Sequence, residues 1–385
     1  MFRKLKSYIS EPVHLAVGLC FMLLSVLFAF WITRIPEVKG ELGLSEGDLG
    51  TALFFTPLGA ICSMLLSSQV IRLLGEGRSA ILSLLFYAAL VIAPVAAFNF
   101  TTLCLALFGL GFCMGWVDIS INSTANAIEK QSKVKIMSTS HGFFSLGGIL
   151  GGVLGGILAG LQLDAVKQML FTFVAAAAVV LFLVYPRIEM VRDRRSLQEK
   201  ALFALPGKSL IGLAIIAFCI MLGEGAIADW STVYMTSALS SGPALAGFGF
   251  AMFSAMMTLG RFNGDYLIEK FGSNRVVSFG LLLALAGLGL LFLHSLSLAL
   301  LGFGLIGLGY SSVVPILFSK ASQKKDVSPA KGLASVATFG YFGFLIGPVV
   351  IGWLAEYTGL TYSFGILLLL TAGALLMVRQ QASSL

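Results

Sequence analysis

The sequence predicts an all-α polytopic membrane protein with twelve transmembrane helices, and three observations lead to this fold class. Apolar residues make up 58% of the 385 residues and charged residues only 11%, whereas a soluble globular domain carries about 25% charged residues. A chain with so little charge cannot cover a water-facing surface of this size, so lipid must be its outer solvent. Apolar segments of about 20 residues, the length that spans a bilayer, recur along the chain. Third, Lys and Arg gather in alternate connections between these segments.

The apolar segments fall into two groups of six. The first six helices are expected at 13–34, 48–71, 79–98, 101–127, 137–161 and 166–185, and the second six at 209–236, 243–268, 276–294, 296–319, 331–355 and 359–379. A polar stretch rich in Arg and Lys separates the groups. The predicted domains are therefore an N-terminal six-helix bundle at 1–185, a cytoplasmic linker at 186–208 and a C-terminal six-helix bundle at 209–385.

The basic residues predict the orientation of the helices. With the N-terminus inside, the cytoplasmic segments hold 21 of the 25 Lys and Arg residues and the outer loops hold three. Because cytoplasmic loops carry the excess of Lys and Arg, both termini are expected in the cytoplasm. The same bias accounts for the net charge of +7, so no nucleic-acid partner is expected.

Motifs of other protein classes are missing from the sequence. It has no P-loop for direct use of ATP, no G-x-S-x-G elbow and no Cys/His cluster with zinc spacing. The five cysteines lie in apolar stretches, as small buried hydrophobic residues do. The sequence therefore predicts no enzyme, no cofactor and no metal site.

Glycines recur between the halves at nearly one offset. The matching positions are Gly75 with Gly272 (197 residues apart), Gly115 with Gly309 (194), and Gly148 and Gly152 with Gly343 and Gly347 (195). This pattern predicts two structurally related halves, as in transporters built from parallel repeats. Glycine pairs every four residues in the fifth helix favour close helix packing, and we expect them to form a surface on which the halves rock.

The connection after the eighth predicted helix resembles the signature loop of the major facilitator superfamily. The run from Gly264 to Gly272 is similar to the pattern G-x-L-a-D-r-x-G-r-r. The resemblance assigns Arg261, Asp265, Glu269 and Gly272 to a loop that controls conformation. Arg261 precedes Asp265 by four residues and is expected to anchor it.

Shorter segments resemble the sugar-permease branch typified by the fucose–proton symporter, and its uncharacterised bacterial relatives. The run from Gly115 to Asn122 is similar to that branch's G-C-L-E-T-A-A-N, and the runs at 34–36, 141–148 and 223–230 resemble the relatives. The resemblance implies alternating access in a bacterial inner membrane and places Asp118 at the branch's membrane acid. The first helix lacks the branch's aspartate, so fucose itself is not the expected substrate.

Polar side chains on the fourth helix form the first candidate site. Asp118, Asn122 and Asn126 follow at four-residue spacing on one helical face. Carboxylate and amide groups together offer acceptors and donors to substrate hydroxyls. Asp118 is also a candidate to exchange a proton, because acids within a membrane span are costly unless they have a function or a partner. A helix-packing acid paired with a neighbouring donor is the alternative.

The seventh helix holds two more acids. Glu224 is a candidate for substrate and proton binding, with a structural hydrogen bond as the alternative. Asp229 lies 195 residues after Arg34, so the repeat offset predicts that these opposite charges occupy equivalent positions. The first and seventh helices face each other in the superfamily that this chain resembles, and the resemblance implies that the pair closes an outer gate. The alternative is that Arg34 merely marks the end of a span.

Three further side chains complete the candidate set. His141, predicted inside the helix bundle, is a candidate proton relay, because imidazole titrates near neutral pH. Trp116 and Tyr310 have nearly equivalent places in the fourth and tenth helices, and aromatic faces of this kind stack on sugar rings. Each of the three has a packing role as its alternative.

The sequence predicts proton-coupled symport of a small polar solute, a sugar or a related hydroxylated compound, by a protein expected to act as a monomer in the lipid bilayer. One alternative is a proton-driven efflux antiporter for a drug or metabolite. The other is a non-transporting sensor or scaffold with a transporter fold.

Overall fold

The structure, a computed structural model, describes residues 7–192, 205–324 and 327–383, and the side chains of Asp265, Ala330 and residues 381–383 are not described. Within these ranges the regular structure is helical, and twelve helices are long and apolar enough to cross a membrane. The spans are Pro12–Glu41, Glu46–Leu74, Glu76–Val95, Phe100–Ser132, Met137–Gly160, Ala165–Ile188, Ile211–Ala238, Pro243–Gly264, Ser273–Leu291, Leu296–Ser322, Lys331–Thr358 and Leu360–Gln380. The predicted fold class and all twelve spans are confirmed.

The contacts divide the chain into two compact units. Unit 1 comprises Met1–Leu42 and Phe55–Glu199, and unit 2 comprises Gly43–Phe54 and Lys200–Leu385. The short segment Gly43–Phe54 makes most of its contacts with the second unit and is therefore part of it. Much of the predicted linker, at 193–204, lies outside the described residues.

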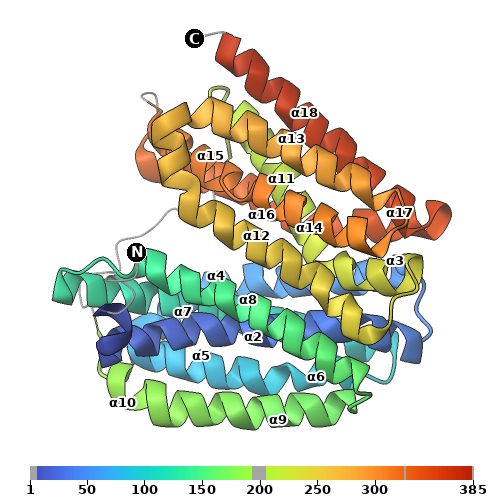
Figure 1. Ribbon diagram of the computed structural model, residues 1–385. Helices are drawn as coiled ribbons and strands as arrows, with labels where there is room; N and C mark the ends of the chain where they lie inside the picture. Colours follow the sequence, from blue (N-terminus) through green and yellow to red (C-terminus); the bar gives the residue numbers. More distant parts are fainter. Residues whose placement is uncertain (1–6, 193–204, 325–326, 384–385) are drawn as a thin grey trace. The chain divides into compact units, whose positions relative to one another are not determined.

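The helices of unit 1 are coloured from blue to light green in Figure 1. They are α2 (Pro12–Glu41), α4 (Phe55–Leu74), α5 (Glu76–Leu90), α6 (Ile92–Val95), α7 (Phe100–Ser132), α8 (Met137–Gly160), α9 (Ala165–Ala178), η1 (Val179–Val184) and α10 (Tyr185–Ile188). The closest packing is between α2 and α8, between α4 and α7, and between α5 and α7.

Unit 2 begins with the short helix α3 (Glu46–Leu53), which packs on α16 (Pro329–Thr358). Its other helices are α11 (Ile211–Val233), η2 (Tyr234–Ala238), α12 (Pro243–Phe271), α13 (Ser273–Leu291), α14 (Leu296–Tyr310), α15 (Val313–Ser322), α17 (Leu360–Ser363) and α18 (Gly365–Ser383). The tightest pairs are α11 with α16 and α13 with α14.

Local sequence signals set several helix ends. Ser45 and Asp48 form a capping box at the start of α3, and Asn99 and Thr102 form one at the start of α7. Proline occupies the first turn of α2, α12 and α16, where its missing N–H would have no helical partner. These ends follow from neighbouring residues alone, so sequence patterns locate them well.

Gly75 and Gly272 make equivalent turns in the two units. Gly75 has φ of +87° before α5, and Gly272 has φ of +81° before α13. Such a backbone conformation costs glycine nothing and strains other residues. The repeat offset of 197 residues for this pair is therefore reflected in the backbone.

Glycines allow α8 to approach α2 closely. A Cβ on Gly147 would lie 2.4 Å from the backbone oxygen of Met22, and one on Gly151 would lie 2.6 Å from the Ala29 side chain. Figure 1 shows α2 and α8 side by side. This row of glycines serves packing inside unit 1, so the prediction that the fifth helix's glycines form a rocking surface does not hold for Gly147 and Gly151.

The same contact recurs in unit 2 and fixes the register of the repeat. A Cβ on Gly343 of α16 would lie 2.4 Å from the backbone oxygen of Phe218 of α11. Gly343 follows Gly147 by 196 residues, and Phe218 follows Met22 by 196 residues. The structural offset for these helices is therefore 196, one residue more than the predicted 195.

Gly111 of α7 supports a testable prediction about helix packing. A Cβ at Gly111 would lie 1.8 Å from the backbone oxygen of Thr56 in α4, whereas one at Gly109 would meet only the Leu90 side chain at 3.5 Å. Since a backbone atom cannot swing aside, Gly111→Ala is expected to destabilise the protein by about 1–3 kcal/mol. The matched control Gly109→Ala should change stability by less than about 0.5 kcal/mol. Thermal unfolding of both purified variants checks this, and equal melting temperatures would contradict it.

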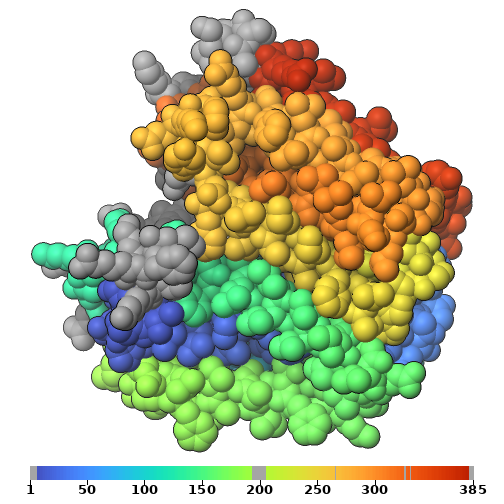
Figure 2. All heavy atoms as spheres, viewed as in Figure 1, coloured from blue at the N-terminus to red at the C-terminus, as the bar shows by residue number. Residues whose placement is uncertain are grey.

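The outward surface of α9 and η1 is apolar. Phe171 is 69% exposed, Val174 62% and Phe182 75%. These residues belong to the light green segment along the lower edge of Figure 2. Large apolar groups exposed on a span of this kind are suited to lipid rather than water.

Candidate functional site

Asp118 and Asn122 form the polar pair of unit 1. The amide nitrogen of Asn122 donates to the Asp118 carboxylate at 3.1 Å and to the Asp118 backbone oxygen at 2.8 Å. Both side chains are partly buried, and both lie one turn apart on α7 as predicted. Asn126 continues the same stripe by one further turn. The carboxylate has a donor but no cation among the described residues.

Trp116 lies on a different face of α7 from Asp118. Its indole nitrogen donates to the hydroxyl of Ser79 in α5 at 2.9 Å, and its ring stacks on Phe86 with centroids 6.0 Å apart. Trp116 and Asp118 are two residues apart, so their side chains leave the helix about 200° from each other. The structure therefore supports the packing alternative for Trp116 and does not bring it to Asp118.

Tyr310 of α14 is enclosed within unit 2. Its side chain is 1% exposed, and its hydroxyl shares a hydrogen bond of 2.7 Å with the hydroxyl of Thr371 in α18. A Cβ on Gly223 of α11 would lie 2.8 Å from the Tyr310 hydroxyl. A side chain so enclosed joins three helices and cannot reach a solute in this state. With a register of 196 residues, Tyr310 also matches Met114 rather than Trp116.

Glu224 and Arg261 form an ion pair between α11 and α12. A guanidinium nitrogen of Arg261 lies 3.0 Å from a carboxylate oxygen of Glu224. The side chains are 42% and 17% exposed, respectively. The sequence predicted Arg261 as the anchor of Asp265 and left Glu224 without a named partner. In the structure Arg261 instead binds Glu224. The side chain of Asp265 is not described, so the predicted contact between Arg261 and Asp265 is not tested.

The Glu224–Arg261 pair predicts a coupling between the two residues. Arg261→Gln should destabilise the protein because it leaves Glu224 as an unpaired charge within a span. The double variant Glu224→Gln with Arg261→Gln should recover part of that loss, with a coupling of about 1 kcal/mol for a pair this exposed. A double-mutant cycle of unfolding free energies in detergent measures it. Strict additivity of the two single effects would show that the pair contributes nothing.

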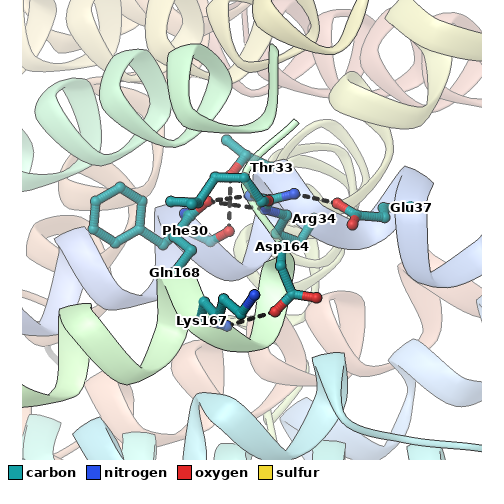
Figure 3. A network of polar contacts seen from close by, with 8 residues as sticks. Phe30, Thr33, Arg34, Glu37, Asp164, Lys167 and Gln168 are labelled. Atoms are coloured by element: carbon teal, nitrogen blue, oxygen red, sulfur yellow. Dashed lines mark hydrogen bonds and ion pairs between the residues drawn. The ribbon is translucent and has the colours of Figure 1, made fainter. Parts of the chain in front are cut away.

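Arg34 is the most deeply buried charge of unit 1 and binds other groups of the same unit. Its side chain pairs with Glu37 one turn along α2, and its Nε donates to the Gln168 side chain of α9 at 3.0 Å. One Nη donates to the Leu163 backbone oxygen at 2.7 Å and to Gln168. Figure 3 shows the guanidinium of Arg34 between Glu37 and Gln168. In this structure the acidic partner of Arg34 is Glu37.

The repeat register also changes the proposed gate. Counting 196 residues from Arg34 reaches Trp230, and Asp229 corresponds to Thr33. Arg34 and Asp229 are therefore not at equivalent positions, because one residue rotates a helical side chain by about 100°. By the same count, Val314 corresponds to Asp118. The gate itself stays a prediction, without the symmetry that suggested it.

His141 lies at the start of α8 and its side chain is exposed, whereas the sequence predicted it inside the bundle. Its ring meets the ring of Phe21 in an edge contact with centroids 4.8 Å apart. In the predicted loop Glu269 is exposed and Gly272 makes the turn into α13. The roles of His141 and of the loop stay predictions.

Sequence reasoning missed two residues that organise unit 1. Glu129, near the end of α7, accepts from the backbone nitrogens of Ile136 at 2.6 Å and Met137 at 2.9 Å and so caps α8. The side chain of Gln168 accepts a hydrogen bond from Arg34, which lies 134 residues earlier in the chain. A lone glutamine within an apolar span was the available signal for the second. Among the described residues, no group of three His, Cys, Asp or Glu residues is placed to hold a metal ion.

Comparisons with known proteins agree with this fold. The model of the family described as Major Facilitator Superfamily matches residues 14–324 and 213–382. An uncharacterized MFS-type transporter of Yersinia pestis is 32% identical over 371 residues, 95% of each chain. Membrane protein MosC of Rhizobium meliloti is 31% identical over 347 residues, 90% of this chain and 84% of that protein.

Solved structures are similar over nearly the whole chain. A bacterial homolog of the human lysosomal transporter Spinster, in an inward-facing and occupied conformation, has a TM-score of 0.76 at 14% identity and covers 98% of this chain and 97% of its own. A D-xylose–proton symporter has a TM-score of 0.73 at 15% identity, covering 96% and 97%. At such identities the likeness shows the fold alone, and the fucose–proton symporter branch stays a prediction.

Proposed function

Because the chain belongs to the Major Facilitator Superfamily, we propose that it is a proton-coupled symporter for a small polar solute, a sugar or a related hydroxylated compound. Membership makes the protein a multi-pass membrane transporter rather than an enzyme, as the sequence predicted. The substrate class, the coupling to protons and the direction of transport are the proposed part.

The pair of Asp118 and Asn122 carries the proposal. A carboxylate and an amide on adjacent turns of one span present acceptors and donors at the spacing of neighbouring hydroxyl groups. Acids within spans persist where they face a cavity or a partner, and Asp118 has no basic partner in the described part of the chain. An amine or a hydrophobic drug would make less use of the amide donor.

The remaining candidates take supporting roles in this proposal. Asn126 extends the stripe of Asp118 in unit 1, and Glu224 with Arg261 forms a polar pair within unit 2. We assign His141 to proton relay at the start of α8, with the Phe21 ring beside it. Trp116 and Tyr310 are left to packing, because their polar atoms are already bonded inside their units.

The proposed setting is a bacterial inner membrane with both termini in the cytoplasm. The bias of Lys and Arg toward alternate connections supports it. The D-xylose–proton symporter shows that this fold serves proton-coupled sugar transport in at least one protein.

A solute screen followed by transport assays tests the proposed function. Purified protein is first screened by thermal shift with sugars, polyols, nucleosides, organic acids and amphipathic amines. The best binder is then offered, radiolabelled, to proteoliposomes whose interior is alkaline. We expect a hydroxylated compound to stabilise the protein and to accumulate inside, and a protonophore to abolish accumulation.

Other outcomes of the screen would replace the proposal. Binding of amphipathic amines, with export driven by an inward proton gradient, would make the protein an efflux antiporter. Binding of a sugar without accumulation or exchange in reconstituted protein would favour a sensor.

A further inference from the structure

Asp229 is a carboxyl group that unit 2 holds inside a membrane span without a partner. The described part of the chain gives it neither an ion pair nor a hydrogen bond, whereas Asp118 has Asn122 and Glu224 has Arg261. We propose that Asp229 carries a proton in this state and releases it during transport, as a proton site separate from Asp118. The proposal rests on the proposed function and adds a proton-carrying group in the second unit.

The contacts of α11 place Asp229 on the side that packs against α16. Backbone atoms of Leu222 lie within 3.0 Å of Cβ positions on Gly343 and Gly347, and a Cβ on Gly225 would lie 2.6 Å from the Phe344 ring. Asp229 follows Leu222 by seven residues, which returns to within about 20° of the same direction on an α-helix. The acid therefore lies on the side of α11 that packs against α16, and its side chain is partly buried.

The internal repeat indicates which residue of α16 lies at the same height along the helix as Asp229. In unit 1 the hydroxyl of Thr33 lies 2.5 Å from a Cβ position on Gly155. With the offset of 196 residues, Thr33 corresponds to Asp229 and Gly155 to Ile351. Ile351 is completely buried. Unit 2 thus has an acid opposite an isoleucine where unit 1 has a threonine opposite a glycine.

The charged and titratable groups on the helices around α11 are either bonded to other residues or far from Asp229. On α12, Arg261 binds Glu224, and Tyr266, Glu269 and Lys270 follow it toward the far end of that helix. Tyr310 of α14 binds Thr371, Lys320 of α15 binds Asn274, and Tyr234 of η2 donates to the backbone oxygen of Leu291. Arg379 of α18 lies two turns past Thr371, toward the opposite end of α11 from Asp229.

The titratable groups of α16 also leave Asp229 without a counter-charge. Glu356 follows Gly347 by nine residues, half a turn round from the face on α11, and accepts from the backbone nitrogen of Gly47 at 2.8 Å. Lys331 and Tyr341 precede Ile351 by twenty and ten residues, about 30 and 15 Å along the helix. Tyr357 is 79% exposed.

An ionised carboxylate in such a place would be costly. Within a membrane span, keeping a carboxylate ionised without a cation or a donor costs several kcal/mol, and a partly buried acid avoids this cost by remaining protonated. Asp118 and Glu224 do not share this situation, because each has a donor at 3.0–3.1 Å. Of these three acids in spans, Asp229 therefore has the strongest reason to hold a proton.

The residues beside Asp229 indicate that this stretch of α11 changes partners. The indole nitrogen of Trp230 and the hydroxyl of Ser231 are both buried and have no hydrogen-bond partner among the residues that the structure describes. Buried polar groups are bonded in the great majority of cases. Three consecutive unsatisfied side chains suit a segment that acquires its partners in another state of the cycle, where Asp229 loses its proton.

Infrared spectroscopy of the purified protein tests the protonation without any substrate. At neutral pH the wild type should show the carbonyl stretch of a protonated carboxyl group within a span, and Asp229→Asn should lose that band. Glu224→Gln is the matched control, because an acid paired with Arg261 contributes no such band. A second variant, Asp229→Thr, copies the residue at the equivalent position of unit 1 in case asparagine perturbs folding. An unchanged carboxyl band in both Asp229 variants would overturn the inference.

Transport assays then separate this inference from the proposed function. In proteoliposomes with the solute found by the screen, Asp229→Asn should bind the solute with wild-type affinity and exchange it. The variant should fail to accumulate the solute when a pH gradient is the driving force. Full accumulation by this variant would overturn the inference and leave the symporter intact. If the wild type itself does not accumulate solute, the proposed function fails, and the infrared result still decides whether Asp229 holds a proton.

Discussion

Replacement of Arg34 by alanine is expected to lower the free energy of unfolding by about 3–5 kcal/mol. The side chain is 1% exposed and donates to Gln168 and Leu163 and pairs with Glu37. Its removal leaves buried acceptors without donors, which costs more than the bonds themselves contributed. Chemical unfolding of the purified protein in detergent measures the loss.

Two further variants make the Arg34 prediction specific. Lysine cannot reproduce the planar fork of donors, so Arg34→Lys should fall between the wild type and alanine. Arg34→Met combined with Gln168→Leu should be more stable than Arg34→Met alone, since it removes the orphaned acceptor together with its donor. The equivalent positions of unit 2, Trp230 and Phe364, are already apolar and fully buried.

Lys167, an exposed neighbour on α9, provides the control for Arg34. Its backbone nitrogen donates to the side chain of Asp164 at 2.8 Å (Figure 3), and its own side chain makes no hydrogen bond or ion pair with any described residue. Lys167→Ala should therefore change the unfolding free energy by less than about 0.5 kcal/mol. A loss for Arg34→Ala no larger than that of Lys167→Ala would show that the buried network contributes nothing.

Asp118→Asn is expected to abolish accumulation driven by a pH gradient. Each proton that moves together with a solute molecule can concentrate the solute about tenfold for each unit of pH difference, since both correspond to about 1.4 kcal/mol. An amide cannot take up and release the proton, so the variant should only equilibrate its solute. Exchange of labelled for unlabelled solute should continue, because the amide keeps the shape of the group.

Asn122→Ala separates binding from coupling at the same site. It removes the donor to Asp118 and one polar contact to the proposed solute. We expect weaker binding, by about tenfold or less for one hydrogen bond, while the accumulation ratio at saturating solute is kept. If Asp118→Asn accumulates solute as well as the wild type does, Asp118 is not a proton-carrying group.

Local patterns were sufficient for the spans and several of their ends. Helix α7 could be predicted from its apolar length and from Asn99 and Thr102 at its start. The pair of Asp118 and Asn122 was also visible in the sequence, because residues four apart on one helix must be neighbours. Both features depend on residues close together in the chain.

Partners from other helices could not be predicted in this way. Arg34 binds Gln168, 134 residues later, and Arg261 binds Glu224 of the preceding span. Rotation about the helix axis selects such partners, and apolar spans with lipid on one side carry a weak signal of that rotation. An error of one residue in the repeat offset turned a side chain by about 100° and matched Arg34 with Asp229 instead of Trp230.

The sequence by itself determined that this chain crosses the membrane twelve times, because hydrophobicity and length are sums over adjacent residues. Only the tertiary structure decided which acids have partners. On the seventh helix it gave Arg261 to Glu224 as a partner, and it left Asp229, beside α16, without one among the described residues. The physical reason is that the state of a charge within a membrane depends on what lies within a few ångströms of it, and helix packing alone sets those neighbours.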